Sequence, residues 1–86
     1  MKKIDLYFSD EVEDKILNKH NISVREIRRE FALGTPKVMR VRGNIYMAIL
    51  HHFDFITVFF EKKNGKGHVL TAYRSSPEQK KRYYQK

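Results

Sequence analysis

The chain opens with a short alternating segment and continues with two segments of helical periodicity. Residues 2–8 alternate apolar with polar side chains, as in a strand. A helix is predicted from Asp10 to about His20, because acidic residues fill its first turn and apolar residues recur on one side. Ser23 has the capping-box spacing of a second helix start, and Gly34 lies where that helix is expected to end.

From residue 38 onward the apolar period changes to two, which predicts strands. Asn64 and Gly65 form the strongest short-range signal for a hairpin turn, and Gly43 with Asn44 marks another turn. The segment 55–60 is apolar on both faces, which is typical of a central, covered strand. We therefore expect four strands in an antiparallel meander, at residues 38–42, 45–50, 55–60 and 68–73.

A last helix follows the strands and completes the predicted architecture. Ser76 is its expected cap, Pro77 its first residue, and the helix continues to about Tyr84. The element order predicts an α+β fold, in which two N-terminal helices pack on a four-stranded antiparallel meander, with an additional N-terminal strand and a C-terminal helix. The length of 86 residues is that of a single domain, residues 1–86.

The net charge of +8 lies entirely in the C-terminal half of the chain. Residues 1–36 contain as many acidic as basic side chains, whereas residues 37–86 contain eleven basic and three acidic ones. Such asymmetry indicates a surface that faces a polyanion, and RNA is the expected partner. A charge that only aids solubility is the alternative. A membrane partner is not expected, because the basic residues alternate along strands and do not line one helix.

Composition excludes several kinds of chemistry. The chain has no cysteine, so disulfides, thiol catalysis and thiolate metal sites are excluded. No apolar run approaches the length of a membrane span, and the N-terminus lacks the apolar core of a signal peptide, so we expect a cytoplasmic location. Motifs of phosphate loops, zinc proteases and serine hydrolases are absent from the sequence, and no cofactor or metal site is predicted.

Three arginines are candidates for binding phosphate. Arg40 and Arg42 lie two residues apart on a predicted strand, so we expect both guanidinium groups on one face, where they match one phosphate or successive phosphates. Charged residues that protect an edge strand are the alternative explanation. Arg74 follows the last strand and precedes a helix start, whose backbone N–H groups favour an anion, and solvation of the strand end is its alternative.

The final helix interleaves cations with aromatic side chains. Lys80 and Arg82 are expected to hold RNA phosphates, while the rings of Tyr83 and Tyr84 suit stacking on unpaired bases. One of the two tyrosines can instead pack the helix on the sheet, because their directions differ by about 100°.

Two adjacent histidines, His51 and His52, lie in a predicted connection and are candidates for proton transfer near neutral pH. Incidental loop residues are the alternative for both. For His20, at the end of the first helix, a structural role is expected, because an imidazolium suits the helix dipole there.

These residue types match the needs of metal-independent RNA cleavage. A base takes the 2′-hydroxyl proton, an acid protonates the leaving 5′-oxygen, and cations stabilise the charged phosphorane. The catalytic candidates are Arg74, Tyr83, His51 and His52, and the RNA-binding candidates are Arg40, Arg42, Lys80, Arg82 and Tyr84.

Three local stretches resemble a known family. Residues 19–27, K-H-N-I-S-V-R-E-I, are similar to the K-H-G-[VI]-S helix–turn–helix signature of BrnT-type toxins. Residues 69–74 look like that family's I-I-S-A-R strand, and residues 76–84 resemble its terminal E-R-x-x-Y helix. Tyr73 stands where the arginine of the strand motif falls, and Gln79 stands where the glutamate of the helix aligns.

BrnT-type toxins belong to the RelE-like superfamily of type II toxin–antitoxin systems. The resemblance spans roughly residues 10–84 and implies a RelE-like fold with ribonuclease activity. It further implies a toxin that cleaves RNA and thereby inhibits translation, with ribosome-associated mRNA among the candidate substrates. Such a toxin is neutralised by a cognate acidic antitoxin. Uncharacterised RelE-like domains with a T-A-Y-type strand resemble the chain equally, so a non-catalytic nucleic-acid-binding domain stays open as the alternative.

Overall fold

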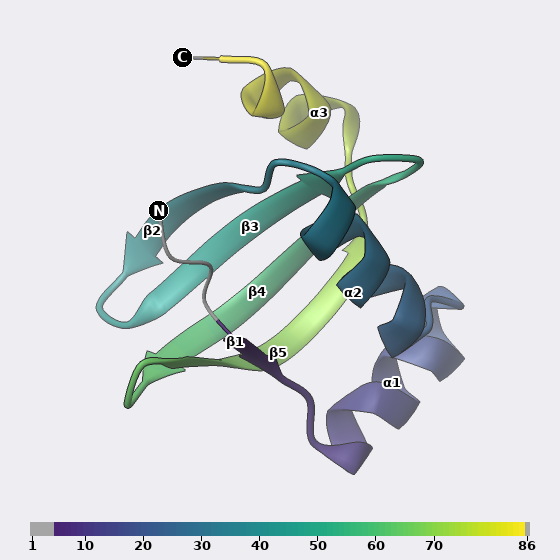
Figure 1. Cartoon of the computed structure of the whole chain (residues 1–86), viewed down its shortest axis with the longest axis vertical. Helices are drawn as coiled ribbons and strands as arrows, with labels where there is room; N and C mark the ends of the chain where they lie inside the picture. Colours follow the sequence, from purple (N-terminus) through teal and green to yellow (C-terminus); the bar gives the residue numbers. More distant parts are fainter. Residues whose placement is uncertain (1–4, 86) are drawn as a thin grey trace.

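The computed structural model describes residues 5–85, which form a five-stranded sheet and three helices (Figure 1). The strand order is β1-β5-β4-β3-β2, so the apolar strand β4 lies at the centre, as predicted. The α+β class and the antiparallel meander from β2 to β5 are confirmed. The elements are β1 (Asp5–Tyr7), α1 (Asp10–His20), α2 (Val24–Leu33), β2 (Lys37–Arg42), β3 (Ile45–His51), β4 (Phe55–Lys63), β5 (Lys66–Arg74) and α3 (Pro77–Tyr83).

The β4–β5 hairpin turns at Asn64 and Gly65, as predicted. Both residues have positive φ angles, 51° and 78°, which the two-residue turn requires. Pairing extends to Lys63 and Lys66, so both strands are longer than the apolar pattern predicted. The difference arises because the polar ends of a hairpin continue the backbone ladder without apolar side chains.

β1 adds a parallel strand to the β5 edge of the sheet. Leu6 pairs with Gly67, and a β-carbon built on Gly67 would lie 2.8 Å from the Phe60 ring and 3.2 Å from the Leu6 side chain. Glycine therefore permits the close approach of the two strands at this point. The additional N-terminal strand is confirmed at residues 5–7, and the predicted residues 2–4 lie outside the described part of the chain.

Serine N-caps begin the three helices. The side-chain oxygens of Ser9, Ser23 and Ser76 each accept a hydrogen bond from a backbone N–H three residues on, at 3.1–3.2 Å. Each bond satisfies one of the N–H groups that a helix start leaves unpaired. α1 ends at Asn21, whose left-handed φ of 53° an asparagine tolerates.

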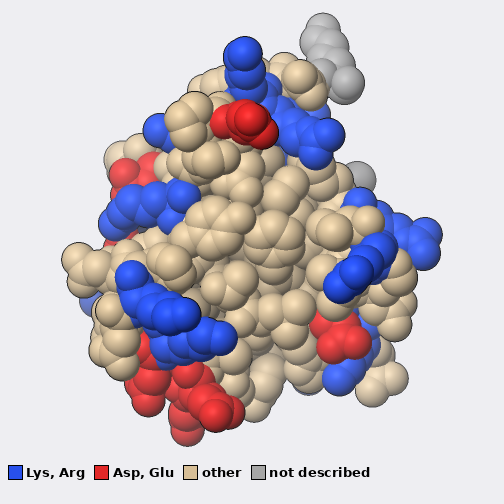
Figure 2. Space-filling model, turned by 180° about the vertical axis from the view of Figure 1, so that it is seen from behind, with Lys and Arg blue, Asp and Glu red and all other residues tan. Residues whose placement is uncertain are grey.

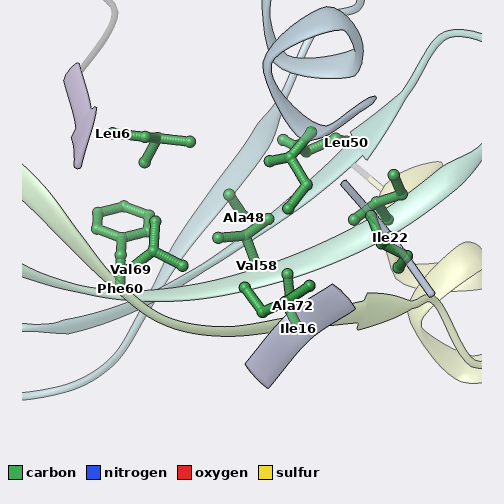
Figure 3. Close-up of a cluster of buried hydrophobic side chains, with 11 residues drawn as sticks. Leu6, Ile16, Ile22, Ala48, Leu50, Val58, Phe60, Val69 and Ala72 are labelled. Atoms are coloured by element: carbon green, nitrogen blue, oxygen red, sulfur yellow. The ribbon is translucent and has the colours of Figure 1, made fainter. Parts of the chain in front are cut away.

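α1 and α2 cover one face of the sheet (Figure 1). Ile16 of α1, Ile22 of the connecting loop and Ile27 of α2 are all at most 1% exposed. Figure 3 shows the labelled core side chains of these segments and of the sheet pointing into one cluster. Their partners on the strands are Leu6, Ala48, Leu50, Val58, Phe60, Val69 and Ala72.

The opposite side of the sheet, called the open face below, carries the alternate strand residues. α3 packs across one end of this face, at the top of the sheet in Figure 1, away from α1 and α2. No helix within residues 5–85 combines the length and the apolar character needed to cross a bilayer. Two paired rows of the open face are Met39, Met47, Phe59 and Thr71, and Lys37, Ile49, Thr57 and Tyr73.

Candidate nucleic-acid interface

Gln79 joins α3 to the open face of the sheet. Its side-chain oxygen accepts hydrogen bonds from the Ser76 backbone N–H at 2.9 Å and from the Thr57 hydroxyl at 3.0 Å. Its side-chain nitrogen donates to the Tyr73 hydroxyl at 2.9 Å. Thr57 is fully buried and shares a further 2.7 Å hydrogen bond with Ser75. These contacts position a seven-residue helix that is too short to be stable in isolation.

Two adjoining hollows, of about 480 and 640 Å³, lie between α3 and the open face, and together they are called the α3 hollow below. Met47 and Arg82 line both hollows, and Met39 and Phe59 add apolar walls to the larger one. The Arg82 guanidinium lies 3.9 Å from the Met39 sulfur, and so reaches from α3 to β2. The charged side chains lining the two hollows are Lys37, Arg40, Lys81 and Arg82, together with the carboxylate of Glu78.

The charges visible on the surface of the open face agree with the basic residues that line the α3 hollow. Figure 2 shows the molecule from the open-face side, where Lys and Arg side chains, with Asp and Glu side chains beside several of them, border a broad uncharged area. An uncharged, partly aromatic floor with cations at its border suits a single-stranded nucleic acid, because bases stack on flat side chains while phosphates meet cations.

Lys80 and Tyr83 of α3 and Tyr84, which follows the helix, do not line the hollow and contact an aromatic cluster at the β3–β4 end of the sheet. His51 stacks on Phe55 at 3.7 Å between ring centroids, and the Tyr83 ring lies 5.6 Å from each of them. The Lys80 ammonium lies 5.6 Å above the Phe55 ring, and the exposed Tyr84 ring lies 6.0 Å from it. The structure thus brings together four residues that the sequence singled out: His51, Lys80, Tyr83 and Tyr84.

The hydroxyl of Tyr83 is already engaged within this cluster. It donates a 2.8 Å hydrogen bond to the backbone carbonyl of Thr35, in the loop between α2 and β2. Of the two tyrosines, Tyr83 therefore packs the helix on the sheet, while Tyr84 is 68% exposed. His51 lies four residues along β3 from Met47, which is about 13 Å, so this cluster is separate from the α3 hollow.

The expectation that Arg40 and Arg42 share one face is wrong. The register shifts between them, so that Arg40 pairs with Tyr46 while Arg42 pairs with the adjacent Ile45. Successive residues of a strand point to opposite faces, and the irregularity at Val41 therefore separates the two arginines. Both are exposed. Arg40 pairs with Tyr46, which packs against the core, and it borders the larger hollow at the edge strand, where its Nε donates to the Gly43 carbonyl at 2.9 Å.

Arg74 lies on the α1–α2 side of the sheet edge. Its guanidinium nitrogens lie 3.8 Å from a Glu26 carboxylate oxygen and 3.7 Å from an Asp54 carboxylate oxygen. The helix start beside it is capped by Ser76 and Gln79, whose side chains accept hydrogen bonds from the backbone N–H groups of Gln79 and Ser76. Carboxylates of the protein thus face Arg74, and two of the backbone N–H groups considered for the predicted phosphate site are already bonded within the chain.

Glu30 holds the loop that carries the adjacent histidines. Its Oε1 accepts hydrogen bonds from the backbone N–H groups of His52, Phe53 and Asp54 at 2.7, 2.9 and 3.0 Å, and Arg29 lies 3.1 Å from Oε2. Burial by itself would raise the pKa of Glu30, but these hydrogen bonds outweigh it and lower the pKa below the ordinary value of 4.5. His52 is thus held through its backbone, and its exposed ring lies against Phe53 at 4.4 Å.

Tyr73 and His20 form a pair at the β5 side of the open face that the sequence did not single out as chemistry. The Tyr73 ring lies 5.9 Å from the His20 ring and 6.1 Å from the Phe59 ring, which itself lines the α3 hollow. The signal present in the sequence is the position of Tyr73 in the strand motif. The role of His20 could not be recognised from the sequence, because only the packing of α1 brings the C-terminal end of this helix to the edge of β5.

Titratable side chains in and beside the hollow are therefore lysine, arginine, tyrosine and histidine, together with the carboxylate of Glu78. Among residues 5–85, no three His, Cys, Asp or Glu side chains lie close enough together to hold a metal ion. The groups present suit binding of a polyanion and proton transfer at a phosphate.

Comparison with solved structures identifies a similar fold. The ribonuclease toxin BrnT of Brucella abortus superposes with a TM-score of 0.69 at 19% sequence identity, over 86% of this chain and 99% of that one. The α+β arrangement predicted from the sequence motifs is thus that of a solved protein. No protein-family model matches the chain, and no curated protein matches it by sequence.

Proposed function

We propose that the protein is a metal-independent ribonuclease toxin of a type II toxin–antitoxin system, which cleaves RNA in the cytoplasm and so inhibits translation. The observation that carries the proposal is the α3 hollow. It combines cations with an apolar and aromatic floor, as binding of a single RNA strand requires. The likeness of the fold to a ribonuclease toxin supports the same conclusion.

We assign different tasks to the residues around the α3 hollow. Lys37, Arg40 and Arg82 come from β2 and α3 and hold phosphates, and they stabilise the charge of the phosphorane. Phe59 offers its ring to an unpaired base. Ribosome-associated mRNA is a natural source of such single strands.

The basic open face also gives a reason for inhibition by an acidic antitoxin. An acidic segment that covers the α3 hollow would pair with the cations that otherwise hold RNA phosphates. Binding of the antitoxin and binding of RNA would then be mutually exclusive, because the same side chains serve both partners. Of the residues that the sequence predicted for RNA binding, we assign this role to Arg40 and Arg82 at the hollow and to Lys80 and Tyr84 at the separate aromatic cluster.

A second candidate function is RNA binding without cleavage, and one observation favours it. Two of the predicted catalytic groups are occupied by the protein itself, since Arg74 faces Glu26 and Asp54, and the Tyr83 hydroxyl faces Thr35. A domain of this kind would bind RNA with steep salt dependence and leave it intact.

Controlled expression in cells separates the two candidates. We expect growth arrest with fragmented RNA when the chain is expressed alone, and relief when a small acidic protein encoded beside it is co-expressed. The double variant Arg40→Gln with Arg82→Gln should abolish the arrest, while the matched variant Lys15→Gln, on the exposed side of α1, should not. Normal growth with intact RNA and a folded protein would exclude the toxin and leave the binding function.

A further inference from the structure

The hydrogen bonds around Gln79 determine which way its amide points. Its oxygen faces a backbone N–H, that of Ser76, which can only donate. The amide nitrogen therefore faces Tyr73 and donates to the phenolic oxygen at 2.9 Å. Because Tyr73 accepts this bond, its own O–H proton is not used in it. The structure thus fixes the phenol and leaves its proton available to a bound molecule.

The hydroxyl network behind Gln79 reinforces this direction. Thr57 donates to the Gln79 oxygen at 3.0 Å, and Ser75 lies 2.7 Å from Thr57 in a buried position. The consistent arrangement is donation from Ser75 to Thr57, and from Thr57 to Gln79. Buried, fully paired networks of this kind hold a side chain in one orientation. Tyr73 is therefore a rigidly positioned proton donor, and it is itself only partly buried.

The surroundings of Tyr73 suit a reaction at a phosphate. On one side, the His20 imidazole lies at 5.9 Å between ring centroids and is partly exposed at the end of α1. On the other side, Phe59 links Tyr73 to the cations of the α3 hollow. The strands from β2 to β5 span about 14 Å, so one RNA strand of a few nucleotides can contact both the cations and the Tyr73–His20 pair.

We infer that Tyr73 is the general acid of RNA cleavage, that His20 is the general base, and that Gln79 is a positioning residue for Tyr73. This inference rests on the proposed function. His20 takes the proton of a ribose 2′-hydroxyl, and the 2′-oxygen forms a bond to the adjacent phosphorus. The bond from phosphorus to the 5′-oxygen breaks, and that oxygen receives the Tyr73 proton. The products are a 2′,3′-cyclic phosphate and a free 5′-hydroxyl, and return of the proton from His20 to the phenolate through water restores the enzyme.

The leaving group provides the test. A short single-stranded RNA in which the bridging 5′-oxygen at one site is replaced by sulfur releases a thiolate, which needs no protonation. A general acid contributes about 10²- to 10⁴-fold, so Tyr73→Phe should lower the cleavage rate of ordinary RNA by about that factor. On the sulfur-containing RNA the same variant should match the wild-type rate. A loss of equal size on both substrates, or no loss on either, would overturn the assignment.

Gln79→Glu tests the positioning role in the same assay. The carboxylate keeps an acceptor for Ser76 and Thr57, but it accepts from the Tyr73 hydroxyl and so turns the phenolic proton away from the substrate. The expected result is again a large loss on ordinary RNA with near wild-type cleavage of the sulfur-containing RNA. If the cleavage rates of the two RNAs fell equally, the substitution would have only a structural effect on α3, and the positioning role of Gln79 would be overturned.

Two further variants complete the design. His20→Asn should be impaired on both RNAs, because the 2′-hydroxyl must lose its proton in either case, and unimpaired cleavage would exclude His20 as the base. Tyr7→Phe is the matched control, since Tyr7 is an exposed open-face tyrosine that contacts His68 at 5.2 Å, and both rates should stay unchanged. If the wild-type protein cuts neither RNA, the proposed function itself fails, and the roles of Tyr73, His20 and Gln79 fail with it.

Discussion

The substitution Glu30→Gln tests how the fold holds the β3–β4 loop. The side chain is fully buried, and its Oε1 accepts three backbone N–H groups within 3.0 Å. Glutamine keeps an acceptor oxygen of the same shape but loses the charge. Since a hydrogen bond to a charged group contributes roughly 1 kcal/mol more than a neutral one, the three bonds together should lose about 3 kcal/mol. The amide nitrogen would also face the Arg29 guanidinium, donor against donor.

Urea unfolding followed by far-UV circular dichroism measures this loss. A fall of about 3 kcal/mol is a large part of the stability of a small domain, so the midpoint should move clearly to lower urea. Glu61→Gln is the matched control, because Glu61 pairs with Lys63 at 3.5 Å near the surface, and its loss should stay under about 1 kcal/mol. Equal, small losses in both variants would refute the argument that Glu30 clamps the loop.

The lowered pKa of the Glu30 carboxylate leads us to expect that the stability of the fold depends on pH. The pKa of Glu30 in the folded protein lies below its ordinary value of 4.5, so the unfolded chain binds its proton first as the pH falls. Its contribution to stability is present above pH 4.5 and is lost as the pH drops through the lowered pKa. Between about pH 5 and 3, the free energy of unfolding should fall less steeply in Glu30→Gln than in the wild type. Parallel pH curves for the two proteins would contradict this.

Three further predictions concern the hollow, α3 and the loop contact. Arg82→Gln should weaken RNA binding and lower the slope of log affinity against log salt by about 1, whereas Lys15→Gln should change neither in the same titration. Tyr83→Phe should cost about 1 kcal/mol in urea unfolding and leave RNA cleavage intact; lost cleavage at unchanged stability would make the hydroxyl catalytic. Gly34→Ala should destabilise by about 3 kcal/mol or more, because the new β-carbon would lie 2.2 Å from the His51 carbonyl oxygen; a stability equal to the wild type would refute this contact.

Local signals in the sequence were sufficient to predict most of the fold. The serine caps and the Asn64–Gly65 turn act within a few residues of the chain, so their positions follow from the sequence directly. The parallel pairing of β1 was not predicted, because a three-residue strand has no local preference for a partner. That pairing depends on Gly67, whose missing side chain lets Leu6 approach Phe60.

The candidate site was less predictable, because its groups come together through tertiary contacts. Arg40 and Arg42 were assigned to one face on strand period alone, and one irregularity at Val41 separates them. Arg74 was expected to be free for phosphate, but carboxylates of α2 and of the β3–β4 loop reach it.

Glu30 was not recognised from the sequence either. Its position between Ile27 and Phe31 on the apolar side of α2 was the available signal, since a charge on a buried face needs partners. The partners themselves, the backbone N–H groups of the β3–β4 loop, are more than twenty residues away in the chain. No short-range pattern could therefore identify them.

The most direct measurement is RNA cleavage by the purified protein in the presence of a chelator of divalent metal ions. End-labelled single-stranded RNA is incubated with the wild type and with the Arg40→Gln, Arg82→Gln double variant. We predict that only the wild type cuts, and that its fragments carry 2′,3′-cyclic phosphate and 5′-hydroxyl ends. Intact RNA with the wild type, or cleavage that requires added metal and leaves 5′-phosphates, would contradict it.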